Sequence, residues 1–254
     1  MLAESRPDIA EASLLIAVEA DPAVDAPMAL AEVDRLADEA AVRGGTSGDI
    51  VAVLREKGFA GDRDDYDDPR NSFLHTVLER RRGLPILLSA LTIAVAKRID
   101  VPIAGVGLPG HFIVVDRSWP EPRYLDPFDG WADLTGERCA DIVRSIAGVD
   151  LVPQHLEPVG VAAMLQRMLL NLRGAYLRRR RLVDALWTVE LSAIVDPDNP
   201  GVRLEHRALL IGLGRYDEAE HSAKEELAGD PPATIRRRIN DQLAAIGELR
   251  LRMN

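Results

Sequence analysis

Residues 86–96 form an almost unbroken apolar run, and this run constrains the fold more than any other stretch of the 254-residue chain. Pro85, just before it, can open a helix because the N–H that proline lacks would be unpaired in the first turn anyway. A helix that is apolar on all sides must be buried on all sides. Lys97 and Arg98 mark its end. The sequence therefore predicts a buried helix around which the other elements pack.

Three short apolar segments follow this helix and are predicted as strands, over about 101–106, 112–115 and 123–125. Residues 117–121 form the turn between the last two. A buried helix on a small antiparallel sheet, in a chain that is otherwise helical, indicates an α+β fold that is mostly helical.

The expected hairpin brings two functional side chains together. A loop over 116–121 would pair residue 115 with 122, 113 with 124, and 111 with 126. His111 and Asp126 would then face each other with their Cβ atoms about 5 Å apart. In that geometry a carboxylate holds an imidazole in one tautomer. In the alternative interpretation, which spacing leaves open, His111 caps its strand after Gly110 and Asp126 is a turn residue before Pro127.

The part of the chain before this core is acidic and helical. Helices are predicted over about 10–20, 28–42 and 47–57, and a fourth from Asp68 to about Arg82, with Arg80–Arg82 in its last turn. Residues 1–70 carry 17 acidic and 7 basic side chains, an excess equal to the net charge of −10. The carboxylate-rich loop 61–68 lacks the glycine and glutamate of a calcium-binding EF-hand, so we expect a solvated loop.

The last hundred residues repeat with a period of 34: Leu182-Val183-Asp184-Ala185 returns as Tyr216-Asp217-Glu218-Ala219, and Asp196-Pro197 as Asp230-Pro231. This period is typical of tetratricopeptide repeats, pairs of helices that stack into a binding surface. The basic run Arg178–Arg181 could bind an acidic partner, but a solvated helix end explains it more simply.

Several classes of protein are disfavoured. The single Cys139 argues against a disulfide framework and fits a reducing cytoplasm. The acidic composition and the absence of a long apolar segment argue against nucleic-acid binding and membrane insertion. Gly105–Gly110 lies between two strands, which does not suit a dinucleotide site. His75 and His111 have no third ligand at a recognisable spacing, so we expect neither a metal nor a cofactor.

The central stretch resembles the transglutaminase-like superfamily, which has a papain-like core. The resemblance is carried by Gly83-Leu84-Pro85, Val101-Pro102, Gly110-His111-Phe112 and Tyr124-Leu125-Asp126-Pro127. The run from Asp68-Pro69-Arg70-Asn71-Ser72 to Asp126-Pro127-Phe128 is similar to a bacterial subfamily that carries a C-terminal tetratricopeptide-repeat tail. The resemblance implies that His111 is the family histidine and Asp126 the family aspartate.

The nucleophile of that family is absent where it is expected, because Pro85 takes the position of the catalytic cysteine. Cys139 lies after Asp126, outside the helix from which attack would start. Ser89, one helical turn beyond Pro85, is the nearest hydroxyl and a weak candidate nucleophile. Glu79 stands near the position of an oxyanion donor, but an ionised carboxylate only accepts hydrogen bonds.

We therefore expect three regions: a helical lead-in over 1–70, a transglutaminase-like core over 71–150 and repeats over 151–254. The first functional hypothesis is a protein- or peptide-binding module without catalysis, which binds through its cleft or its tail. A second copy of this chain is another partner that we consider, which would give a homodimer. The alternative is a hydrolase or acyltransferase in which His111 and Asp126 activate water or Ser89.

Overall fold

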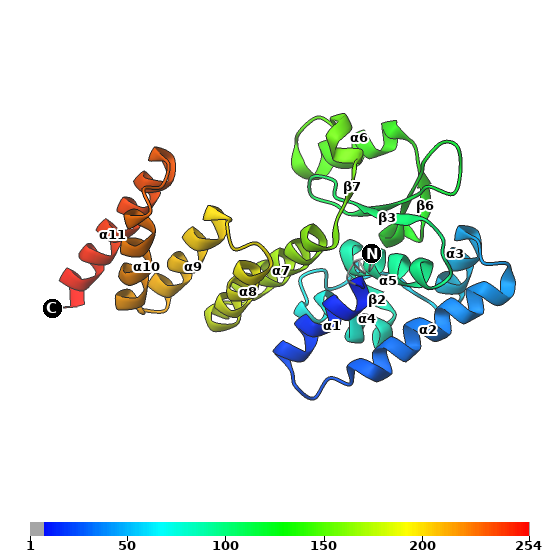
Figure 1. Ribbon diagram of the computed structural model, residues 1–254, viewed down its shortest axis with the longest axis horizontal. Helices are drawn as coiled ribbons and strands as arrows, with labels where there is room; N and C mark the ends of the chain where they lie inside the picture. Colours follow the sequence, from blue (N-terminus) through cyan, green and yellow to red (C-terminus); the bar gives the residue numbers. More distant parts are fainter. Residues whose placement is uncertain (1–7, 254) are drawn as a thin grey trace, which may run out of the picture. The chain divides into compact units, whose positions relative to one another are not determined.

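A computed structural model describes residues 8–253, and the chain divides into two compact units between Met168 and Leu169 (Figure 1). The first unit holds the helices α1 (Ile9–Ala20), α2 (Ala26–Arg43), α3 (Ser47–Glu56), α4 (Leu74–Arg80), α5 (Pro85–Arg98) and α6 (Gly136–Ala147). It also holds the short 3-10 helices η1 (Pro69–Ser72), η2 (Pro127–Asp129) and η3 (Pro153–Leu156). Its strands are β1 (Ala60–Gly61), β2 (Arg82–Gly83), β3 (Ile103–Val106), β4 (Ile113–Asp116), β5 (Arg123–Asp126), β6 (Ala132–Leu134) and β7 (Pro158–Val159).

Helix α5 is the predicted buried helix, and nearly all of its side chains are buried from Pro85 to Ala96. Helices α1 to α4 pack against it, and so do strands β3 and β4. Residues 9–56 thus pack on the core, as a lead-in over 1–70 would. They are part of the unit that contains the sheet, because their apolar faces cover α5.

The main sheet is antiparallel with the strand order β6-β5-β4-β3-β7. All four residues of β4 are buried because both faces of the sheet are covered. On one face Ile113 and Val115 pack with Cys139 and Val143 of α6, whereas α5 contacts β3 and β4 (Figure 1). The chain is thus mostly helical with a small antiparallel sheet, as predicted.

The register of the β4–β5 hairpin differs from the predicted one by two residues. Val115 pairs with Tyr124 rather than with residue 122, and Asp116 is the last residue of β4 rather than the first of the loop. The reason is a tertiary contact: Ser47 of α3 donates a 2.5 Å hydrogen bond to the Asp116 carboxylate, which keeps Asp116 in the sheet. A shift of two residues leaves every side chain on its original face.

The predicted helix from Asp68 to Arg82 is wrong, because the structure divides this segment. Asp68 caps η1 as expected, but Phe73 has extended backbone angles (φ −114°, ψ 124°) and separates η1 from α4. Helix α4 then ends at Arg80, and the next residue, Arg81, has a φ of 58°, so that Arg82 can pair with Ala60 in the parallel β1–β2 pair. Arg80 consequently points at acidic side chains rather than at solvent beyond a helix end.

The second unit is entirely helical where it is described. Helix α7 (Val161–Arg178) leads into it, and α8 (Leu182–Val195), α9 (Pro200–Gly212), α10 (Tyr216–Ala228) and α11 (Ala233–Met253) follow. Consecutive helices from α8 onward pack on each other, and α9 also contacts α11 around Leu204, Ala223 and Ile239. Helices α8 and α10 begin at Leu182 and Tyr216, which occupy equivalent positions 34 residues apart. None of the helices described in either unit is long and apolar enough to cross a bilayer.

Candidate functional site

His111 and Asp126 lie in hydrogen-bond contact, with 2.9 Å between the imidazole Nε2 and the carboxylate Oδ2. Both side chains are buried, with 8% and 5% of their surface exposed. Continuing the observed hairpin register places Asp126 opposite Ile113, so His111 is its diagonal neighbour two residues further along. The two side chains meet despite the shifted register because diagonal positions on one face are within reach of a long side chain.

The Asp126 carboxylate is oriented by the turn that follows it. Its Oδ1 accepts hydrogen bonds from the backbone N–H groups of Phe128 (3.0 Å) and Asp129 (3.4 Å), so Asp126 caps η2. This arrangement leaves Oδ2 free to accept from His111. Asp126 is therefore both a turn residue before Pro127 and the partner of His111, and the two interpretations of its role are compatible.

The turn before β4 places His111. Gly110 has a φ of +78°, and a Cβ on it would lie 2.5 Å from the Cγ2 of Ile146 in α6. Only glycine meets both conditions, a left-handed backbone and a close neighbour. The His111 N–H then donates to the Leu108 carbonyl (3.0 Å), and the Phe128 ring stands edge-on to the imidazole with 6.2 Å between ring centroids.

This geometry fixes which ring nitrogen can act on a ligand. A carboxylate only accepts hydrogen bonds, so the Nε2 of His111 must carry the proton that Asp126 receives. In the neutral imidazole the lone pair is then on Nδ1, which is the atom available as a base or an acceptor. The sequence did not single out Phe128, the aromatic neighbour of the ring, although it directly follows the Asp126-Pro127 pair.

The start of α5 carries no nucleophilic side chain at its first residue. Pro85 is buried at the first helical position. Ser89, one turn further, is fully buried and its hydroxyl has no hydrogen-bond partner among the described residues, so it does not bond to His111. Thr92 behaves differently: its hydroxyl donates to the Leu88 carbonyl (2.7 Å) and accepts from the indole N–H of Trp131 (2.9 Å).

Cys139 is a structural residue in this geometry. It is fully buried in α6, within the apolar cluster under the sheet. Burial, with a smaller contribution from the Asp126 charge, raises the pKa of its thiol. A thiol with a raised pKa and no solvent access forms little of the reactive thiolate.

His75 and Glu79 belong to a different surface. Both line a cleft of about 690 Å³ together with residues of α2, and neither His111 nor Asp126 lines it. Burial lowers the pKa of His75, whose Nε2 lies 3.0 Å from the Thr76 hydroxyl. Within residues 8–253, no group of three or more His, Cys, Asp or Glu side chains is arranged to hold a metal ion.

Comparison with known proteins identifies relatives of the region that holds the His111–Asp126 pair. A family model described as the transglutaminase-like superfamily matches residues 29–170. A UPF0162 protein of Pseudomonas aeruginosa is 32% identical over 251 residues, 92% of this chain and 90% of the relative. A UPF0162 protein of Xylella fastidiosa is 32% identical over 174 residues, and the match spans 62% of that relative's length.

A eukaryotic protein also matches this region. F-box only protein 21 of Homo sapiens is 31% identical over 171 residues, which cover 63% of this chain and 27% of that protein. No solved structure matches the chain.

Proposed function

This chain belongs to the transglutaminase-like superfamily, and we propose that it is a member that binds a protein or peptide without catalysing acyl transfer. The observation that carries the proposal is Pro85 at the first position of α5, where the resemblance to the family expects the catalytic cysteine. A proline side chain has no atom that can attack a carbonyl.

The other possible nucleophiles near this helix do not replace the missing thiol. Cys139 is fully buried with a raised thiol pKa, and the Ser89 hydroxyl has no bond to a base. An activated serine needs a base within hydrogen-bond reach to take its proton. The retained His111–Asp126 pair then acts as a hydrogen-bonding element of a binding surface, with Nδ1 of His111 as the acceptor.

We further propose that the second unit is a tetratricopeptide-like tail that contributes to partner binding. The 34-residue period and the helix starts at Leu182 and Tyr216 support this assignment. A cavity of about 650 Å³ lies in this unit and is lined by the carboxylates of Asp198, Glu225, Glu226 and Asp230 and by a single cation, Arg203. Arginines already hold two of these carboxylates, Glu226 through Arg203 and Arg207 and Asp230 through Arg236. Asp198 and Glu225 therefore carry the negative charge that favours a peptide with lysine or arginine side chains.

Catalysis is tested with peptides that contain glutamine and a primary amine as acceptor. We expect neither ammonia release nor amine incorporation above the uncatalysed rate, and no difference between the natural chain and His111→Ala. Turnover that His111→Ala abolishes would show that the chain is an enzyme and would overturn the proposal.

Binding is tested with a fluorescent lysine- and arginine-containing peptide whose anisotropy is followed at low and physiological salt. We expect the double variant Asp198→Asn/Glu225→Gln to weaken binding roughly threefold, because each rim charge is worth less than about 1 kcal/mol. Asp241→Asn, an exposed change on α11 outside the cavity, is the matched control. Equal affinities in all three chains would exclude this cavity as the peptide site.

The 2.9 Å His111–Asp126 contact favours one alternative, a hydrolase or acyltransferase in which the dyad activates water or Ser89. A positioned base of this kind contributes about 10²–10⁴-fold to a rate. Under this alternative, His111→Gln abolishes hydrolysis across a panel of amides and esters, whereas Ser89→Ala distinguishes water from serine as the nucleophile. Under the binding proposal, neither change alters the rate.

A further inference from the structure

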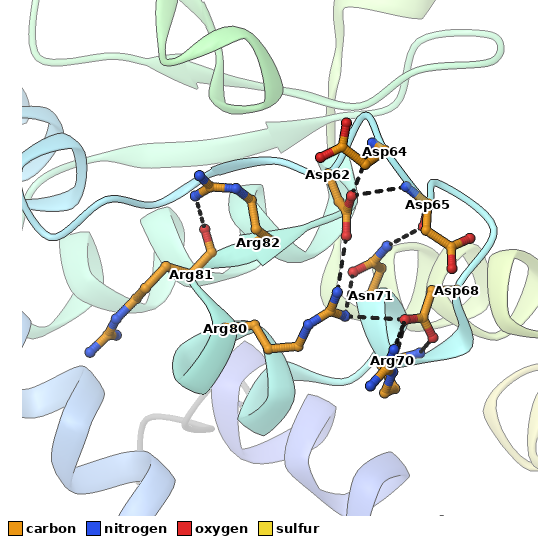
Figure 2. Close-up of polar contacts among 9 residues, drawn as sticks. All are labelled: Asp62, Asp64, Asp65, Asp68, Arg70, Asn71, Arg80, Arg81 and Arg82. Carbon is orange, nitrogen blue, oxygen red and sulfur yellow. Dashed lines mark hydrogen bonds and ion pairs between the residues drawn. The ribbon is translucent and has the colours of Figure 1, made fainter.

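The two end carboxylates of the acidic loop, residues Asp62–Asp68 between β1 and η1, are joined by one cation, Arg80, while Arg70 also pairs with Asp68 (2.7 Å). Figure 2 shows Arg80 reaching up from α4 between the two ends of the loop. Its guanidinium donates to Asp62 Oδ2 (3.2 Å), to Asp68 Oδ2 (3.3 Å) and to the side-chain oxygen of Asn71 (3.1 Å). Both end carboxylates are buried, so these bonds are shielded from water.

Backbone bonds fix the interior of the acidic loop. Asp62 Oδ1 accepts from the N–H groups of Asp64 and Asp65 (3.2 Å each), and the Asn71 amide donates to the Asp65 carbonyl (2.8 Å), as Figure 2 shows. Burial alone would raise the pKa of both end carboxylates. The N–H groups of Asp64 and Asp65, with Asn71 and the charge of Arg80, hold the pKa of Asp62 below its usual value. Hydrogen bonds from Arg70, with the charges of Arg70 and Arg80, hold the pKa of Asp68 below its usual value. The acidic loop is therefore an ordered element.

The acidic loop and the residue before it contact η2. A Cβ on Gly61, the residue before the loop, would lie 2.5 Å from the ring of Phe128 and 2.6 Å from its carbonyl oxygen. Within the loop, Arg63 lies over the Phe128 ring and pairs with Asp129 (2.8 Å). The Tyr66 ring meets the Phe128 ring edge-on, with 5.9 Å between centroids.

The short helix η2 connects these contacts of the loop to His111 and Asp126 of the candidate site. The N–H groups of Phe128 and Asp129 hold Oδ1 of Asp126, and Oδ2 of that carboxylate receives His111. The Phe128 ring also borders the imidazole directly. A displacement of η2 would therefore rotate the carboxylate and move the ring neighbour of His111 at once.

We propose that the acidic loop, locked by Arg80, is a positioning device for His111: it holds η2 so that Asp126 fixes the imidazole with Nδ1 available. Gly61 and Arg80 are thus positioning residues, acting through Phe128 and Asp126. The inference rests on the His111–Asp126 pair invoked in the proposed function, but it requires neither a bound partner nor turnover.

The test is the Nε2–H proton of His111, observed by ¹H–¹⁵N NMR of the ¹⁵N-labelled full chain well below its melting temperature. In the natural chain we expect the Nε2–H tautomer and a proton protected from exchange with water. In Gly61→Ala, whose new Cβ must displace Phe128, we expect exchange about tenfold faster, comparable to the loss of one hydrogen bond. Gly136→Ala is the control, because a Cβ there meets nothing within 4 Å.

A second variant keeps the test decisive if Gly61→Ala does not fold. Arg80→Lys keeps the charge but lacks the planar fork that bonds Asp62, Asp68 and Asn71 together, so it should also speed the exchange. Its control is Arg82→Lys, since Arg82 is exposed and bonds only backbone carbonyls in the described contacts.

If Gly61→Ala lowers the melting temperature but leaves Nε2–H exchange unchanged, the loop stabilises the fold without positioning His111. Should that chain not fold, the same result in Arg80→Lys leads to the same conclusion. An unprotected Nε2–H in the natural chain would overturn the inference as well. Neither result depends on catalysis or binding. Conversely, turnover by a chain that shows the expected exchange would overturn the proposed function and leave this inference standing.

Discussion

Pro85 is the residue on which the chemistry of this chain depends. It is the first residue of α5, at the end of the helix that carries the positive end of the helix dipole. A thiol at such a position has a lowered pKa, which is why helix N-termini are suited to cysteine nucleophiles. The fold thus keeps an environment that would activate a thiol, while the side chain present cannot use it.

A thiol introduced at this position should be reactive. In Pro85→Cys we expect alkylation by iodoacetamide at neutral pH at least about tenfold faster than that of Cys139 in the natural chain. Both positions are buried, but position 85 is the first residue of a helix, where the helix dipole lowers a thiol pKa most. Mass spectrometry of the labelled peptides gives both rates. Adding His111→Ala should slow the reaction. An introduced thiol as unreactive as Cys139 would show that position 85 is not next to an activating group.

Ser89 and Thr92 form a second test at this scale, because one buried hydroxyl is unpaired and the other has two partners. We expect Ser89→Ala to raise the free energy of unfolding by about 1 kcal/mol, through loss of an unsatisfied polar group and gain in helix propensity. Thr92→Val should lower it by about 1–3 kcal/mol, since it leaves the Trp131 N–H buried without an acceptor. Urea unfolding followed by tryptophan fluorescence measures both. A large loss in Ser89→Ala would mean that its hydroxyl has a partner after all.

Among the elements, helix α3 contacts the end of β4 through the Asp116 carboxylate. The Asp116 carboxylate is buried and accepts hydrogen bonds from Ser47 (2.5 Å), the Ser118 N–H (2.9 Å) and the Trp119 indole (3.2 Å). Burial disfavours its charge, but these donors outweigh burial and hold the pKa of Asp116 below its usual value. The same contact keeps Asp116 paired with Arg123 in the β4–β5 hairpin.

A lowered folded-state pKa determines the sign of the pH dependence. The stability that Asp116 contributes is present above its unfolded pKa of about 3.9 and is lost as the pH falls through the lower folded value. Asp116→Asn should therefore cost about 2 kcal/mol at pH 7, and the difference from the natural chain should shrink below about pH 4. Urea unfolding at pH 7 and pH 3 measures it. Asp133→Asn, an exposed residue paired with Arg123, is the control and should cost less than about 1 kcal/mol.

At the scale of the whole molecule, the chain divides into two units, and the second unit has a buried polar centre of its own. In the second unit this is Arg207, which is fully buried and donates to Glu226 (2.6 Å), Gln242 (3.0 Å) and Ser222 (3.4 Å). These partners come from α10 and α11, so one side chain of α9 ties three helices of the tail together.

Removing this guanidinium should loosen the tail. We expect Arg207→Ala to destabilise the second unit by about 3 kcal/mol, because it leaves the Glu226 carboxylate without its most buried partner. Hydrogen exchange resolved over α9, α10 and α11 measures the loss. Arg237→Ala, exposed on α11, is the matched control. Unchanged exchange in Arg207→Ala would show that packing around Leu204 and Ile239 holds these helices alone.

The sequence by itself determined the elements that depend on local pattern. The apolar run 86–96 predicts the buried helix, and apolar residues at helical spacing predict helices α1 to α3 to within two residues of their observed ends. The 34-residue period relates Leu182 to Tyr216, which are the first residues of α8 and α10. Periodicity and end signals are properties of neighbouring residues, so they can be read without the fold.

Only the tertiary structure decided the register, the broken helix and the role of the acidic loop. Asp116 stays in β4 because Ser47 holds it, α4 ends at Arg80 because β2 pairs with β1, and Asp62 and Asp68 at the two ends of the loop turn inward because Arg80 lies between them. Each is a contact between segments far apart in the chain, whose free energy outweighs the local preference. The pairing of His111 with Asp126 was predicted from a register that is two residues off. The two side chains still meet because a shift of two residues keeps both on one face.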